Sequence, residues 1–284
     1  MATETIPAPS DSELAAKLLR AAGALAVSIR AKGLQELQAG RQIKANAADF
    51  ATAADLAAEK FLYEQLRLAR PEDSILGEEG AGFEGSSGRV WVVDPVDGTF
   101  NFASGSTYWC SALALVTGVS GVDLRSTAVN FAHAEVLLGA IYQPEEEKMW
   151  MGGSQHQATC NGQLISVDSR QQVGELAAGS YIHPGWLADP RAAVPWQRAA
   201  VLPATLRMLG SGSCDLARVG QGELGVWFQH SCPSWDWLPG KGVVEAAGGD
   251  TAVVPVNGLE WFVAGPAGAV AELKAALEQG AVPA

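Results

Sequence analysis

Hydrophobic and polar positions along the chain follow two different rhythms. In the first half, apolar residues three or four positions apart predict two helices, one capped by Asp11 or Ser12 and one over 55–70. Short apolar runs broken by glycine, proline and polar residues then predict strands at 74–77, 90–93, 109–117, 129–142, 148–151 and 157–167. This half is expected to place two helices on an antiparallel, meander-like sheet, an α+β arrangement.

From about residue 170 the pattern changes, and predicted strands alternate with predicted helices. The expected strands are 176–182, 201–202, 224–228, 251–254 and 261–263. The expected helices are 189–200, 211–219, 235–247 and 267–277. This alternation predicts a layered α/β half. We therefore expect a disordered tail over residues 1–12 and one domain over 13–284, with subdomains at about 13–170 and 171–284.

Composition narrows the class of protein. Of the 284 residues, 48% are hydrophobic and 18% are charged, which is typical of a globular domain. A formal charge of −12, with no long run of lysine and arginine, argues against a nucleic-acid-binding surface. The four cysteines form no C-x-x-C pair, so reduced thiols are expected. Neither a signal peptide nor an apolar run of membrane-spanning length is visible, which predicts a cytoplasmic protein without a membrane partner.

The clearest chemistry lies in residues 90–102. An apolar strand ends there in Asp94 and Asp97, with a proline between them, and Gly98 and Thr99 follow. Two carboxylates so close together repel each other unless a cation lies between them. Backbone N–H groups at the start of a following helix could hold an anion beside that cation. The alternative is an exposed Asp-Gly turn that binds nothing.

Other acidic residues stand at comparable positions, namely Asp55, the pair Glu78-Glu79, and Asp236. Each lies at a predicted strand end or helix start, where side chains from distant parts of a fold can converge. Carboxylates are hard oxygen donors, and the four histidines lack zinc-type spacing, so the set suits Mg²⁺ or Mn²⁺. Such a site beside an anion-binding turn indicates phosphoryl chemistry. For Asp55, simple capping of its helix is the alternative.

Several segments resemble signatures of the inositol monophosphatase family in order and spacing. They are Thr52-Ala53-Ala54-Asp55, Gly77-Glu78-Glu79, residues 94–102, and Trp235-Asp236 followed by Gly240. The resemblance covers nearly all of residues 14–280. It implies a five-layer αβαβα sandwich of the inositol monophosphatase and fructose-1,6-bisphosphatase type. It also implies a homodimer, because the family is commonly dimeric.

The resemblance implies a lithium-sensitive, Mg²⁺-dependent phosphomonoesterase with two or three metal ions per site. The implied metal ligands are Glu78, Asp94, the Val96 carbonyl, Asp97 and Asp236. The nucleophile would be a metal-bound water, positioned and deprotonated by Glu78 and the Thr99 hydroxyl, with Asp55 orienting Thr99. No covalent intermediate is expected, and backbone N–H groups of Gly98 and Thr99 would hold the phosphate oxygens.

The expected substrate-binding residues are Asp97, Gly98, Thr99, Gly212, Gln229 and Asp236. Gln229 stands where the family usually has a glutamate that binds the sugar hydroxyls of the substrate. A neutral glutamine cannot supply the charge-assisted hydrogen bond that a glutamate would make. The substrate is expected to be a small polyol or sugar monophosphate, with inositol 1-phosphate first. Histidinol phosphate and fructose 1,6-bisphosphate are alternatives, as is a non-catalytic relative that binds a phosphorylated metabolite. Whether neighbouring His230 lines the pocket is left open.

Overall fold

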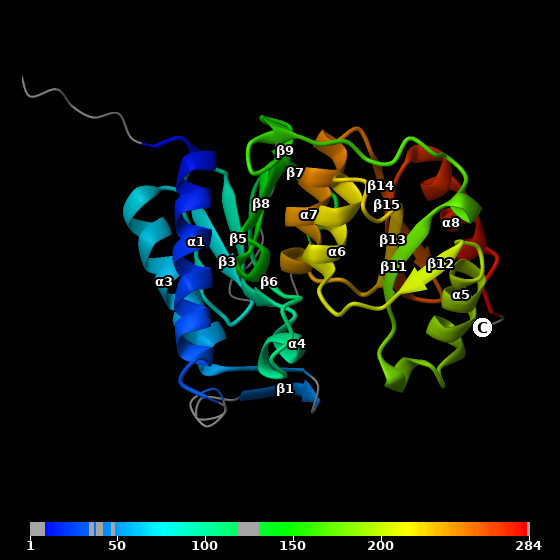
Figure 1. Cartoon of the computed structure of the whole chain (residues 1–284), viewed down its shortest axis with the longest axis horizontal. Helices are drawn as coiled ribbons and strands as arrows, with labels where there is room; N and C mark the ends of the chain where they lie inside the picture. The colour runs from blue at the N-terminus through cyan, green and yellow to red at the C-terminus, as the bar shows by residue number, and fades with distance from the viewer. Residues whose placement is uncertain (1–8, 34–36, 38–41, 47–48, 119–130, 283–284) are drawn as a thin grey trace, which may run out of the picture.

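A computed structural model provides the structure of the chain, and it describes residues 9–33, 37, 42–46, 49–118 and 131–282. At 43–46 and at 49 only the backbone is described. Helices and sheets form five layers that follow one another along the long axis of the molecule (Figure 1). The predicted layered αβαβα arrangement is therefore confirmed.

The first layer consists of helices α1 (Asp11–Arg30) and α3 (Ala53–Ala69). The cap of α1 is Ser10, which forms a capping box with Glu13, so the prediction of Asp11 or Ser12 as the cap is wrong. The helix thus begins inside the predicted tail, and residues 1–8 lie outside the described residues. Apolar residues of both helices pack against the first sheet in one hydrophobic cluster.

The first sheet has eight strands in the order β10-β9-β8-β7-β6-β5-β3-β4. Their bounds are β3 Ser74–Gly77, β4 Gly82–Phe83, β5 Val90–Asp97, β6 Cys110–Thr117, β7 Glu135–Gln143, β8 Lys148–Gly153, β9 His156–Cys160 and β10 Gln163–Leu164. All neighbours pair antiparallel except β3 and β5, which confirms the meander. The segment predicted as one strand over 157–167 contains the two antiparallel strands β9 and β10. They are joined by a turn at Asn161 and Gly162, and both of these residues have a positive φ.

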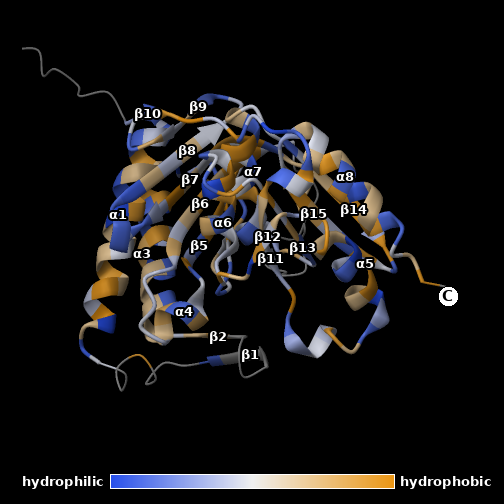
Figure 2. Ribbon diagram, turned by 45° about the vertical axis from the view of Figure 1, so that its right-hand side comes forward, coloured by the Kyte–Doolittle hydropathy of each residue, from blue (hydrophilic) through white to orange (hydrophobic). Residues whose placement is uncertain are grey.

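The middle layer holds helices α6 (Gly212–Gly220) and α7 (Ser234–Ala246), which contact both sheets. Hydrophobic residues run through the strands and through α7 between them (Figure 2). Pro239 is the sixth residue of α7 and lies beyond its first turn. The helix continues past it, and the Pro239 carbonyl lies against Gly139 of β7, where only a residue without a side chain fits.

The second sheet has five strands in the order β12-β11-β13-β15-β14. Their bounds are β11 Ala177–Tyr181, β12 Thr205–Arg207, β13 Val226–His230, β14 Asp250–Val256 and β15 Leu259–Gly265. Helices α5 (Pro190–Ala200) and α8 (Ala267–Glu278) cover its outer face. The predicted strand at 201–202 is wrong, because Val201 forms the C-cap of α5 and the chain extends only at β12.

Smaller elements complete the description. They are β1 (Gln42–Asn46), β2 (Asp49–Ala51), α4 (Thr99–Ala103), and short 3-10 helices at Pro144–Glu146, Val173–Glu175 and Pro184–Trp186. Strands β1 and β2 pair antiparallel, and neither is among the strands that the sequence predicted. The two large sheets use strands from before and after residue 170 respectively, although one hydrophobic cluster joins residues of both halves. The division near residue 170 stays a prediction. In the described part of the chain, no helix combines the length and apolarity that crossing a membrane requires.

The contact between Gly139 and α7 generates a stability prediction. A Cβ added at Gly139 would lie 2.1 Å from the Pro239 carbonyl oxygen, so Gly139→Ala must push α7 away from the sheet. We expect the free energy of unfolding in urea to fall by about 2 kcal/mol. Gly174→Ala is the matched control, because its Cβ would meet only the Leu202 carbonyl oxygen at 3.7 Å. Equal effects of the two substitutions would contradict the close packing of α7.

Candidate active site

A bulge in β5 brings Asp94 and Asp97 to the same side of the first sheet. Asp94 pairs with Ala112 of β6, and Asp97 pairs with Cys110, so β5 carries one extra residue between them. Residues three apart in a regular strand point to opposite faces, and the extra residue cancels that alternation. The bulge contains Pro95, which has no N–H to pair, and its carbonyl accepts a 2.7 Å hydrogen bond from the Ser111 hydroxyl.

Two further acidic residues reach this point from other elements. Asp236 lies in the first turn of α7, and carboxylate oxygens of Asp94, Asp97 and Asp236 come within 4.8 Å of one another. Glu78 directly follows β3, whose last residue is in register with Val93 of the parallel strand β5. Its backbone N–H donates to the Val93 carbonyl at 3.1 Å. The predicted acidic metal ligands thus come from three separate parts of the chain.

The electrostatics of this cluster fit a bound cation. Asp94 is 1% exposed, and no N–H group or hydroxyl of the described residues donates a hydrogen bond to its carboxylate oxygens. Burial, and then the charges of Glu78, Asp97 and Asp236, raise the pKa of Asp94 well above its usual value. Buried acceptors without donors are rare and costly in folded proteins. A hard divalent cation would supply both the missing contacts and the missing positive charge.

Asp97 is held differently from Asp94. One of its oxygens accepts hydrogen bonds from the Ser211 hydroxyl at 2.8 Å and from the Ser213 backbone N–H at 2.6 Å. Burial raises the pKa of Asp97, and these hydrogen bonds from the start of α6 oppose that rise. Asp97 therefore ties the first sheet to the middle layer.

Asp55 both caps its helix and contacts Thr99. Helix capping and the orientation of Thr99, which the sequence offered as alternative roles, are therefore compatible. One oxygen accepts the Thr52 N–H at 2.8 Å and the Thr52 hydroxyl, as in a capping box. The other lies 3.0 Å from the Thr99 hydroxyl, which is also 3.0 Å from the Val96 carbonyl oxygen. Burial is the main cause that raises the pKa of Asp55 to about 6.

Gly98 makes the turn from β5 into α4. Its φ of 89° is left-handed, and a Cβ there would lie 3.0 Å from the Gly210 carbonyl oxygen. The segment before α6 thus packs directly on the turn. Asn101 secures this contact, because its side-chain amide donates to the carbonyls of Tyr108 and Leu209 at 2.8 and 2.7 Å.

A cleft of about 770 Å³ opens onto these groups, a size suited to a small-molecule ligand. The predicted site residues that line it are Glu78, Asp97, Gly98, Thr99, Gly212, Gln229 and Asp236. Asp55, Asp94 and Val96 are buried and do not belong to its lining. His230 does not line the cleft either, because it packs against Trp186 and Trp261 with ring centroids 5.1 Å apart in each case.

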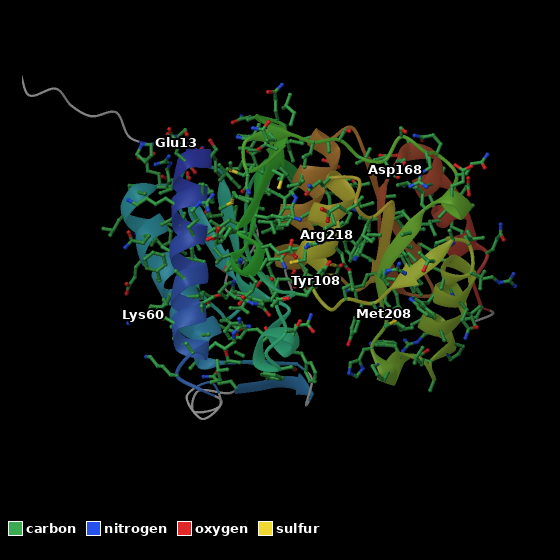
Figure 3. All side chains as sticks on the ribbon, in the orientation of Figure 1. Glu13, Lys60, Tyr108, Asp168, Met208 and Arg218 are labelled. Carbon is green, nitrogen blue, oxygen red and sulfur yellow. The ribbon has the colours of Figure 1, made fainter. Side chains whose placement is uncertain are left out.

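Sequence reasoning missed several polar residues that position the site. Glu59 of α3 is buried and accepts the backbone N–H groups of Glu79 and Ala81, which shapes the turn that carries Glu78. Asp215 of α6 lines the cleft and accepts a 2.5 Å hydrogen bond from the Tyr108 hydroxyl, and burial raises the pKa of Asp215 to about 7. Figure 3 shows Tyr108 beside Arg218, whose guanidinium lies 4.8 Å from the Tyr108 ring centre. Asn101, which also positions the site, stood in a segment that the sequence had singled out, residues 94–102.

The fold and site together define a layered αβαβα protein with a multi-carboxylate site that could hold a metal ion. The sequence profile described as the inositol monophosphatase family matches residues 11–282. This chain belongs to the inositol monophosphatase family. The predicted family is thus confirmed, as is the predicted enzyme class, a phosphoric monoester hydrolase.

Individual relatives agree with this assignment. The chain is 30% identical over 249 residues to the inositol-1-monophosphatase of Mycobacterium leprae, covering 83% of this chain and 80% of that protein. It is 27% identical over 234 residues to a protein named Nus factor SuhB of Xylella fastidiosa, covering 82% and 78%. The crystal structure of extragenic suppressor protein suhB from Bartonella henselae superposes with a TM-score of 0.80 at 22% identity, covering 95% and 98%. That last likeness concerns the fold alone.

The unpaired buried carboxylate of Asp94 generates a prediction about cation binding. Asp94→Asn keeps the shape and removes one negative charge, so we expect the metal-free protein to become more stable to heat. In the parent protein, Mg²⁺ at about 100 times its Kd should add about 2.7 kcal/mol of stability. The variant should lose most of that gain, as measured by Tm with and without Mg²⁺.

Asp215→Asn is the matched control for this experiment. It removes a buried carboxylate from the same cleft but outside the cluster of Asp94, Asp97 and Asp236. We expect it to keep the Mg²⁺-dependent rise in Tm, whatever it does to the stability of the metal-free protein. An equal loss in both variants would count against Asp94 as a ligand.

Proposed function

We propose that this protein is a Mg²⁺-dependent phosphomonoesterase that hydrolyses a small polyol or sugar monophosphate, with inositol 1-phosphate as the first candidate. The observation that carries the proposal is the unpaired, fully buried Asp94 carboxylate beneath a cleft lined by Glu78, Asp97 and Asp236. Membership of the inositol monophosphatase family supports it. Mn²⁺ would be a substitute, because it prefers the same hard oxygen donors.

The proposed ligands of two or three metal ions are Glu78, Asp94, the Val96 carbonyl, Asp97 and Asp236. Bound cations would lower the pKa of a coordinated water and offset the charge of the phosphate ester. Asp94 and Asp97 come from one bulged strand and Asp236 from a helix start, so the set is built before any ligand arrives. Such preorganisation avoids reorganising the site during the reaction.

Thr99 and Glu78 would position the attacking water. When the Thr99 hydroxyl donates to Asp55, its oxygen lone pairs remain free to accept a hydrogen bond from that water. Glu78 lines the same cleft and would accept the proton. The water oxygen then attacks phosphorus, the ester bond breaks, and the leaving alkoxide takes up a proton.

The rest of the cleft would bind the phosphate and the alcohol. Backbone N–H groups of Gly98 and Thr99 are proposed to hold phosphate oxygens, with Gly212 leaving room beside them. Gln229 would contact substrate hydroxyls as a neutral donor and acceptor. Histidinol phosphate and fructose 1,6-bisphosphate are the alternative substrates that the sequence left open. Lithium inhibition, a homodimer and a cytoplasmic location stay predictions.

A hydroxyl at residue 99 is required by this mechanism. The protein should release phosphate from inositol 1-phosphate with Mg²⁺ and not with EDTA, and Thr99→Val should lower kcat by about 100-fold. Thr99→Ser is the matched control, because it keeps the hydroxyl that contacts Asp55, and it should retain most of the activity. Mg²⁺ binding, followed by calorimetry, should persist in both variants. Equal kcat values for the valine and serine variants would exclude the proposed role of Thr99.

Gln229 offers a separate test of substrate choice. Restoring a carboxylate with Gln229→Glu allows charge-assisted hydrogen bonds to hydroxyls, which are about twice as strong as neutral ones. We therefore expect kcat/KM for inositol 1-phosphate to rise about tenfold relative to ethyl phosphate, which has no hydroxyl. An unchanged ratio of the two kcat/KM values would show that Gln229 does not contact substrate hydroxyls.

A further inference from the structure

Exposed apolar side chains gather at the cleft. Among the described residues, seven large hydrophobic side chains are exposed, and four of them line the cleft, namely Phe100, Tyr181, Leu187 and Met208. Single exposed apolar residues are ordinary on protein surfaces, whereas a concentration of them marks a binding site. The exposed apolar surface is therefore continuous with the proposed catalytic cleft.

Three separate segments supply this apolar part of the lining. Phe100 comes from α4, Tyr181 and Leu187 flank the 3-10 helix Pro184–Trp186, and Met208 lies between β12 and α6 (Figure 3). Ile182 and Phe50, which are buried, also belong to the apolar lining. We call Glu78, Asp97 and Asp236 the acidic part of the lining, and Phe100, Tyr181, Leu187 and Met208 its apolar part.

The charges in the cleft limit what can bind beside the apolar part. No described residue of its lining is a lysine or an arginine, and Gln229 is neutral. Among these residues, His183 is the one side chain that could offer a second phosphate a positive charge, and the lining also contains the acidic Asp215. A bisphosphate is thus poorly matched to this cleft.

On the basis of the proposed phosphomonoesterase activity, we propose that the preferred substrate is not inositol 1-phosphate but a phosphate monoester whose alcohol carries a large apolar or aromatic group. The phosphate lies at the acidic cluster, and the apolar group lies against Tyr181, Leu187 and Met208. Burying these half-exposed side chains and the substrate's own apolar surface favours binding in both ground state and transition state.

The test compares 2-phenylethyl phosphate with ethyl phosphate in Mg²⁺. Both leaving groups are simple alkoxides, so a difference in kcat/KM reports contacts to the phenyl ring. We expect kcat/KM to be about tenfold higher for the phenylethyl ester, as one well-placed apolar contact allows. Calorimetry provides a second readout, in which 3-phenylpropylphosphonate should bind about tenfold more tightly than propylphosphonate. Fructose 1,6-bisphosphate should be the poorest substrate of the set.

Variants locate the apolar contact. The double substitution Leu187→Ser and Met208→Ser should remove most of the preference for the phenyl group. Two ratios should then lie within about threefold of one: that of the kcat/KM values for the phenylethyl and ethyl esters, and that of the Kd values for propylphosphonate and 3-phenylpropylphosphonate. Leu164→Ser is the matched control, because Leu164 is 70% exposed but lies on β10, outside the cleft lining. It should leave both ratios unchanged.

The outcomes separate this inference from the proposed function. Hydrolysis of ethyl and inositol phosphates without a preference for the phenyl ester would overturn the inference alone. Loss of all phosphate release would overturn the proposed function, while the phosphonate ratio would still test the apolar contact. If the double variant keeps both ratios but changes from dimer to monomer in light scattering, the apolar part binds a second copy and the inference is wrong.

Discussion

Repulsion among buried carboxylates is the constraint on which the rest of this structure depends. Asp94 has no hydrogen-bond donor, lies among Glu78, Asp97 and Asp236, and its pKa is raised accordingly. A fold gains nothing from such an arrangement by itself, since unpaired buried charge costs several kcal/mol. The surrounding layers must supply enough hydrophobic burial to hold these groups together in the absence of a cation. Proteins accept such a cost at sites where binding repays it.

The geometry of the cluster follows from a few local features. The bulge at Pro95 turns Asp94 and Asp97 to one side, and the parallel pairing of β3 with β5 brings Glu78 alongside. The first turn of α7 adds Asp236 from the middle layer. Hydrogen bonds through Asn101 and Ser211 then hold the segment before α6 against the same turn. Each side chain is placed by the end of an element that packs in the core, so small shifts of the surface leave the cluster intact.

The sequence predicted that Asp94, Asp97 and Asp236 would come together, but it did not reveal the residues that support them, for a physical reason. Asp94, Asp97 and Asp236 follow apolar runs or begin helices, and these local patterns are visible in a single chain. Glu59 sits inside α3, where nothing local distinguishes it from a solvated acid, and Asp215 lies in the first turn of α6, where an acid is ordinary. Only tertiary packing makes both of them buried acceptors. The same holds for His230, which lies beside Gln229 in the sequence yet alternates to the other face of β13 and packs on tryptophans. The short strand β12 escaped prediction because three residues carry too little pattern.

The separation of the cleft into an acidic and an apolar part has a consequence for how substrate choice can change. The acidic residues lie on β5, α7 and the end of β3, where substitution disturbs buried charge. The apolar residues Tyr181, Leu187 and Met208 are partly exposed and lie at or between element ends, where substitution costs little stability. Altering them changes which alcohol is bound without altering the groups that would cleave its phosphate. Gln229 lies on β13 and faces the cleft, and its neutral amide would let the pocket accept an apolar alcohol without leaving an unpaired carboxylate.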